Sequence, residues 1–208
     1  TRTAAILVKD NSKSSSSTGA MSDFSDLGIF KSNTNINNEL LTLKSPTLMT
    51  EVVNRLGLNA TFTIRKGLKN VDLYKVSPVT ITFCDKIEVP LSFTIKFSSK
   101  EAFAISELEI SGEDIGETLS AQMGDSIQTS AGIMIVSPTQ EFTDAFIGTS
   151  IRYVRGSVRA AVDTYSNALV AELGNEDATI INLSINDTSI RKAESSARAT
   201  QDLSLIHI

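Results

Sequence analysis

Residues 158–193 read VRAAVDTYSNALVAELGNEDATIINLSINDTSIRKA, and the change of periodicity inside this stretch decides the fold. Its first half carries apolar residues at spacings of three and four, which predicts one long amphipathic helix. The stripe consists of Val158, Val162, Tyr165, Leu169 and Leu173. Gly174 followed by Asn175 is expected to end this helix, because both residues tolerate the left-handed backbone that often follows a helix.

The second half of the stretch alternates as a strand does. β-branched residues recur between Ala178 and Ile185, with Asn182 and Ser184 among them, so we expect a strand covered on at least one face. The cap of a second helix is expected at Asp187, Thr188 or Ser189. We expect this sequence to hold only the start of that C-terminal helix. The pattern predicts an α+β fold, a mixed β-sheet packed with amphipathic helices.

A second helical block lies nearer the start of the chain. Residues 36–43 and residues 46–56 each carry apolar residues of helical period. Ser45 and Pro46 between them fit an N-cap and a first helical position, so one helix is expected to stop and another to start there. Gly57 is expected to end the second helix.

Short strands dominate the middle of the chain. Residues 91–97 alternate strictly, which puts Leu91, Phe93, Ile95 and Phe97 on one face. A turn is expected near residues 98–100. Further strands are expected around residues 103–110, 127 and 133–136, and residues 150–154 are expected to rejoin the main sheet. We therefore expect one α+β domain interrupted by a β-rich insertion.

The two ends of the sequence are expected to be cut. Residues 4–8 alternate as a strand with no signal peptide before them, so the natural protein should begin further upstream. Residues 203–208, LSLIHI, do not continue the preceding helical pattern. They can be back-translated into the transposon-end adapter of sequencing libraries. We expect them to be a non-native tail, and the other interpretation is a real apolar C-terminal strand.

Composition limits the classes of function. The 208 residues carry a net charge of -5 and the sequence pI is about 5.0, which argues against a nucleic-acid partner because phosphate binding needs a basic stripe. There is no run of about 18 apolar residues, so no segment of this sequence is expected to span a membrane. A single cysteine can form no internal disulfide.

The sequence offers little for catalysis. The only histidine, His207, lies in the suspect tail, which argues against a Ser-His or Cys-His nucleophile. Cys84 is expected to be a small, half-buried core residue. Gly112–Thr118 lacks the spacing of a phosphate loop and is expected to be an acidic hairpin turn. No ligand cluster for zinc is apparent, and no cofactor is expected.

Two further groups of charged residues are weighed. The carboxylate pairs Asp23 with Asp26 and Glu176 with Asp177 could act as acid and base, or bind calcium, but solvated loop residues are the better interpretation. The arginines Arg152, Arg155 and Arg159 could contact an anionic sugar polymer, and a solvated face or a subunit salt bridge is expected instead. No residue is assigned as catalytic, cofactor-binding or metal-binding.

Three blocks carry a resemblance to a known family. They are VRAAVDTYSNALVAEL with INLSINDTSIRKAE, NELLTLKS with LMTEVVNRLGL, and LYKVSPV. Together they resemble the periplasmic domain of Wzz-type chain-length determinants, the polysaccharide co-polymerases, and are most similar to members linked to a bacterial tyrosine autokinase. The resemblance implies a first part of the α+β domain at residues 1–83, an insertion at 84–148, a second part at 149–194 and a divergent end at 195–208.

The same resemblance implies a function without catalysis in this segment. Such a domain at the periplasmic face of the inner membrane oligomerises with itself. It sets the chain length and export of capsular, exopolysaccharide or O-antigen polymer together with a membrane polymerase and an outer-membrane export protein. The alternative is a periplasmic or secreted carbohydrate-binding or carbohydrate-active domain. That alternative needs aromatic platforms, and the chain has no tryptophan and three tyrosines.

Overall fold

The computed structural model describes residues 2–7, 38, 40–85, 89–173, 180–185 and 190–207. The chain has an α+β fold and divides into two compact units. The terminal unit combines both ends of the sequence, Thr1–Leu56 with Val162–Ile208. The inserted unit is the continuous segment Gly57–Ala161 between them.

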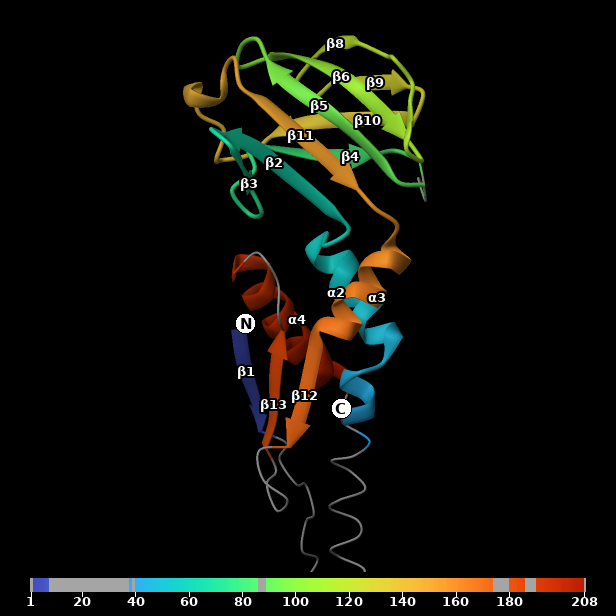
Figure 1. The fold of residues 1–208 in the computed structure, drawn as a ribbon, viewed down its shortest axis with the longest axis vertical. Helices are drawn as coiled ribbons and strands as arrows, with labels where there is room; N and C mark the ends of the chain where they lie inside the picture. The colour runs from blue at the N-terminus through green and yellow to red at the C-terminus, as the bar shows by residue number, and fades with distance from the viewer. Residues whose placement is uncertain are drawn as a thin grey trace, which may run out of the picture. The chain divides into compact units, whose positions relative to one another are not determined.

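A three-stranded sheet organises the terminal unit. Strand β13 (Ile180–Ile185) lies in its centre, between β1 (Arg2–Leu7) and β12 (Leu169–Leu173), and both ladders are antiparallel. The predicted strands at both ends of the sequence are therefore confirmed for the described residues, and they pair with each other (Figure 1). The side chains of Ile181, Leu183 and Ile185 are completely buried.

One helix covers this sheet, and a second helix packs against the first. Helix α4 (Ile190–His207) packs against β1 and β13, and α2 (Pro46–Leu56) packs against α4. The predicted start of α2 is confirmed, because the backbone N–H of Leu48 donates to Ser45 Oγ at 3.2 Å. Its predicted end is confirmed as well, because Gly57 has a φ of 61°, in the left-handed region that glycine adopts without strain.

The long helix predicted from Val158 to Leu173 is wrong in its second half. Helix α3 spans Val158–Ala168, and β12 begins at Leu169. The stripe misleads because a spacing of four residues keeps two side chains on one face of a helix and also on one face of a strand. Pairing decides between them, since Leu169 lies opposite Ile185 on β13 and Leu169 is buried while Val170 is 45% exposed.

The expectation that the helical pattern stops before residue 203 is also wrong. Helix α4 continues to His207, and Leu203 is buried, four residues after buried Ala199 and three after buried Thr200. This spacing continues the buried side of the helix. The expected caps at residues 187–189 and the expected helix end at residues 174–175 lie outside the described residues.

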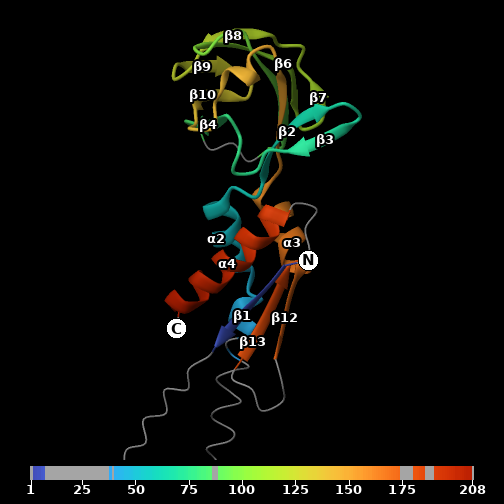
Figure 2. The ribbon, with the colours of Figure 1, turned by 90° about the vertical axis from the view of Figure 1, so that its left-hand side faces the viewer.

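The inserted unit is a sandwich of two sheets. The larger sheet has the order β3-β2-β11-β5-β6-β7, with β8 also paired to β6, and the smaller has the order β4-β10-β9. Figure 2 shows the smaller sheet facing the larger one. The strands are β2 (Ala60–Lys66), β3 (Lys69–Asp72), β4 (Val79–Phe83), β5 (Leu91–Phe97), β6 (Ala102–Ile110), β7 (Glu113–Asp114), β8 (Leu119–Gln122), β9 (Ser126–Thr129), β10 (Gly132–Pro138) and β11 (Ser150–Arg155). The paired strands are antiparallel, and an isolated bridge between Phe97 and Ile147 is parallel.

One hydrophobic core joins the two sheets. It includes the predicted inward face of β5, where Phe93, Ile95 and Phe97 are completely buried, and Met134 and Val136 from β10 on the other side. Alternate residues of an antiparallel strand point to one face, so this face of the larger sheet is apolar and the opposite face is left polar.

The boundaries of the inserted unit differ from those expected for the insertion. Residues 84–148 were expected, whereas the inserted unit spans Gly57–Ala161. The reason is strand pairing: β11 lies between β2 and β5, so strands on both sides of the expected insertion complete its sheet. The third resembling block, Leu73–Val79, is a turn that leads into β4.

Candidate functional site

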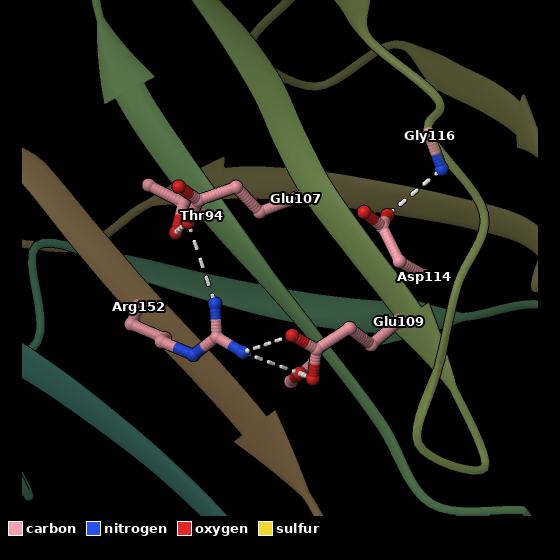
Figure 3. Close-up of polar contacts among 7 residues, drawn as sticks. Thr94, Glu107, Glu109, Asp114, Gly116 and Arg152 are labelled. Carbon is pink, nitrogen blue, oxygen red and sulfur yellow. Dashed lines mark hydrogen bonds and ion pairs between the residues drawn. The ribbon is translucent and has the colours of Figure 1, made fainter.

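A polar network lies on the outer face of the larger sheet. The cross-strand register places Arg152 of β11 opposite Thr94 of β5, and Ser92 of β5 opposite Glu109 of β6. Glu107 of β6 has a positive φ of 54° where the register with β5 shifts, so a bulge turns an additional carboxylate toward this face. Figure 3 shows the side chains converging on the guanidinium group.

The guanidinium of Arg152 is shared between two carboxylates. Its Nη2 donates to Glu109 Oε1 at 3.0 Å and to Ser92 Oγ at 2.9 Å, and its Nη1 lies 3.4 Å from Glu107 Oε2. Ser92 donates to Glu109 Oε2 at 2.9 Å, and Thr94 donates to Glu107 Oε2 at 2.7 Å. Arg152 is thus neutralised within its own chain and supplies no excess positive charge for an anionic polymer or for a second subunit.

This network changes the acidity of Glu109. The hydrogen bond from Ser92 and then the bonds and charge of Arg152 hold the pKa of Glu109 below its ordinary value. A lowered pKa stabilises the folded state above the pKa of the unfolded chain. That contribution is lost as the pH falls through the lowered pKa of the folded protein.

Replacing Arg152 with alanine is expected to raise the pKa of Glu109. The Coulombic attraction and the guanidinium hydrogen bonds disappear, while the bond from Ser92 remains. NMR titration of the glutamate carboxyl carbons measures the shift. The variant should also lose a small part of its stability at pH 7, and this loss should shrink below the pKa of Glu109. Arg152→Lys is the matched control and should keep much of the shift. An unchanged titration in Arg152→Ala would contradict the network.

A cleft of about 510 Å³ lies at one side of the sandwich. Its lining comes from the start of β2, from β4 with the two residues that follow, and from the end of β11. Arg155 stacks its guanidinium over the ring of Phe83, with 4.9 Å between the guanidinium carbon and the ring centre. Asn59 Nδ2 donates to the carbonyl of Gly156 at 3.3 Å. This bond connects the residue before β2 with the residue after β11.

The expectation that Cys84 is half-buried is wrong. Cys84 is exposed and lines the cleft. The cause is its place in the alternation of the strand: Thr82 and Thr80, two and four residues earlier, are exposed as well, whereas Ile81 and Phe83 pack against the core. Cys84 therefore lies on the exposed face of the strand, opposite to the face that the expectation of a core residue required.

Tyr153 also lines the cleft. It is 4% exposed, and its ring lies between Phe62 and Phe93 at centroid distances of 4.9 and 5.0 Å. Burial raises the pKa of Tyr153 to about 12, while the charge of Arg155 acts in the opposite direction. The phenol therefore stays neutral throughout the physiological range.

The stability of the protein is expected to fall between pH 10 and 12. The unfolded chain loses the Tyr153 proton near pH 10 and the folded chain near pH 12, so the stabilisation is complete below pH 10 and is lost as the pH rises through the folded pKa. The loss amounts to about 2–3 kcal/mol. Urea unfolding at pH 9 and pH 11.5 measures it. Tyr153→Phe should remove the pH dependence that Tyr153 contributes, and an equal dependence in both proteins would contradict the assignment.

The other candidates from the sequence fall in different places. The acidic hairpin is confirmed: β7 pairs with β6, and Asp114 Oδ1 accepts a hydrogen bond from the Gly116 N–H at 2.9 Å (Figure 3). Arg159 is exposed on α3. The pairs Asp23 with Asp26 and Glu176 with Asp177 lie outside the described residues. In the described ranges no group of three or more His, Cys, Asp or Glu could hold a metal ion.

Comparisons with protein families and with curated proteins identify no relative of this chain. No protein-family model matches the chain, and a search of the curated proteins also finds no match. The resemblance to chain-length determinants therefore rests on the three sequence blocks. Among the described residues, no helix combines the length and the apolar character that crossing a bilayer requires.

Proposed function

We propose that this chain is a non-catalytic assembly domain of a polysaccharide co-polymerase of the chain-length determinant family, from a member linked to a tyrosine autokinase. The order of elements around the resembling blocks supports the proposal. Helix α2 coincides with the block LMTEVVNRLGL, and strand β13 followed by α4 coincides with INLSINDTSIRKAE. The proposal assigns the chemistry to a membrane polymerase and to a kinase domain in the same assembly.

The observation that carries the proposal is the pairing of the two ends of the sequence. Strand β1 lies beside β13, and α4 packs against both strands, while the β-rich inserted unit is a continuous segment between them. A tether to one membrane at both ends is compatible with this arrangement, because strands near both ends of the sequence lie in one unit.

In this proposal the terminal unit is the base of an oligomer at the periplasmic face of the inner membrane. Copies of the protein assemble around the export path together with the polymerase and the outer-membrane export protein. The assembly limits the length of a capsular polysaccharide, exopolysaccharide or O-antigen.

The carbohydrate-binding alternative gains no support from the cleft. A sugar-binding site usually offers an open aromatic face. The ring of Phe83 is covered by the Arg155 guanidinium, and Tyr153 is 4% exposed. The cleft therefore offers little open aromatic surface to a saccharide.

The first experiment recovers the complete reading frame from the same genomic source. We expect a transmembrane helix before residue 1 and another beyond the family-like region that ends near residue 194. A frame that ends at Ile208 behind a cleavable signal peptide would overturn the proposal. Deletion of the complete gene should then change the length distribution of the surface polysaccharide on a gel.

Complementation with matched variants tests the terminal unit in the complete protein. Leu183→Asp, which places a carboxylate in the buried centre of β13, should fail to restore polymer length. Asn182→Asp, exposed on the same strand, should restore it. An unchanged length distribution in the deletion strain would contradict a role in chain-length control.

A further inference from the structure

Strand β4 has one open edge in the inserted unit. It pairs with β10 on one side, and none of the described strands pairs with its other side. The cleft lined by Ile81–Asp85 runs beside it. An open strand edge is a template for a further strand, because its N–H and C=O groups point outward in a regular array.

The register shows which groups point outward. The Cys84 N–H donates to the carbonyl of Ile133 at 2.9 Å, so these two residues form a hydrogen-bonded pair. Such pairs alternate along an antiparallel ladder. The backbone groups of Thr80 and Thr82 therefore face β10, and those of Ile81 and Phe83 point to the open side.

At Val79, the first residue of β4, the outward backbone groups are already hydrogen-bonded to a side chain. Ser77 Oγ donates to the carbonyl of Val79 at 2.7 Å and accepts from the Val79 N–H at 3.4 Å. The remaining outward groups are two donors and two acceptors, on Ile81 and Phe83. Their spacing of two residues equals the spacing at which an antiparallel strand exchanges hydrogen bonds.

β4 also lacks the charges that usually protect an open edge. Its sequence VTITF has high β-propensity and no charged residue, glycine or internal proline. The edge strands β3 and β7 of the same unit carry charges: β3 contains Lys69 and Asp72, and β7 is Glu113–Asp114. Strands β8 and β9 are shorter than β4, at four residues each against five.

We propose that β4 pairs antiparallel with β4 of a second copy of this chain, on a two-fold axis at Thr82. In this register Ile81 of each copy exchanges two hydrogen bonds with Phe83 of the other, which satisfies all four outward groups. The proposal rests on the strand edge alone and is independent of any role in polysaccharide synthesis.

The side chains suit a second copy on both faces of the joined sheet. On the exposed face Thr82 lies opposite Thr82 of the second copy and Thr80 lies opposite its Cys84, so no like charges meet. On the inner face Ile81 lies opposite Phe83 of the second copy. A cleft of about 510 Å³ lies beside β4 at this edge.

Disulfide trapping tests the register. Thr82 and its counterpart form a non-hydrogen-bonded pair about 4.5 Å apart at Cα, which lies within the range for a disulfide. The purified chain with Thr82→Cys and Cys84→Ser should form a covalent dimer under mild oxidation with oxidised glutathione. The matched control is Asn70→Cys with Cys84→Ser, on the exposed edge of β3, and it should stay largely monomeric. Equal cross-linking of both variants, or none in Thr82→Cys, would overturn the proposal.

Sedimentation of the unmodified chain tests the hydrogen bonds. Ile81→Pro removes an N–H that the pairing with β10 does not use, so the strand can remain folded. Ile81→Ala removes the same side chain but keeps the N–H. We expect the dimer dissociation constant to rise about tenfold more in Ile81→Pro than in Ile81→Ala. Equal dissociation constants in two folded variants, or a monomer at all concentrations in the unmodified chain, would overturn the pairing.

Discussion

Replacing Phe93 with alanine is expected to lower the free energy of unfolding of the inserted unit by about 3–5 kcal/mol. Phe93 is completely buried on β5, and its ring lies 5.0 Å from that of Tyr153. The substitution removes the apolar contacts and leaves a cavity in the core shared by the two sheets. Because a domain of this size is stabilised by about 5–15 kcal/mol in total, the variant should be close to unfolding at physiological temperature.

Urea unfolding followed by circular dichroism measures this loss. The matched control is Lys96→Ala, which lies on the same strand with its side chain exposed and should change stability by less than about 0.5 kcal/mol. The phenol of Tyr153 provides a second readout, since water admitted beside it should lower its pKa from about 12 toward the ordinary value. A loss below about 1 kcal/mol would show that Phe93 is not part of a packed core.

Replacing Leu183 with aspartate is expected to unfold the terminal unit at neutral pH. Leu183 is completely buried on β13, the central strand, between Ala4 of β1 and Ala171 of β12 in the ladder. A carboxylate at this position is removed from water, and the substitution supplies no positively charged partner for it. The cost is therefore about 4 kcal/mol or more.

Amide hydrogen exchange shows which of the two units is unfolded by this substitution. Amides of β12 and β13 should lose their protection in Leu183→Asp, and amides of β5 and β10 in the inserted unit should keep more of theirs. Asn182→Asp on the same strand is the control, because that side chain is exposed and both residues are polar. Full protection of β13 in Leu183→Asp would contradict the buried position of Leu183.

Sequence pattern predicted the elements whose signals are local. Strand β5 follows from strict alternation, and helix α2 follows from an N-cap, a proline at the first position and a closing glycine. The acidic hairpin at residues 112–118 follows in the same way from its turn residues. Each of these signals lies within about ten residues of the element that it specifies, so no knowledge of distant partners is needed.

The polar network and the cleft could not be predicted in this way. Arg152 stands out in the sequence, but its partner Glu109 is 43 residues away, and the pairing of β11 with β5 brings them together. The orientation of Glu107 depends on a bulge that the alternating pattern does not reveal. The exposed face of Cys84 depends on which side of β4 meets the core.

The sequence by itself determined the α+β class, the β-rich middle of the chain and the pairing-competent strand near each end, because apolar periodicity selects which face of each element is buried. Tertiary structure alone decided that residues 169–173 form a strand, that the inserted unit extends to Gly57 and Ala161, and that Arg152 is neutralised internally. The physical reason is common to all three: a ladder between distant strands satisfies backbone groups and sets side-chain neighbours, and local propensity is too weak to oppose it.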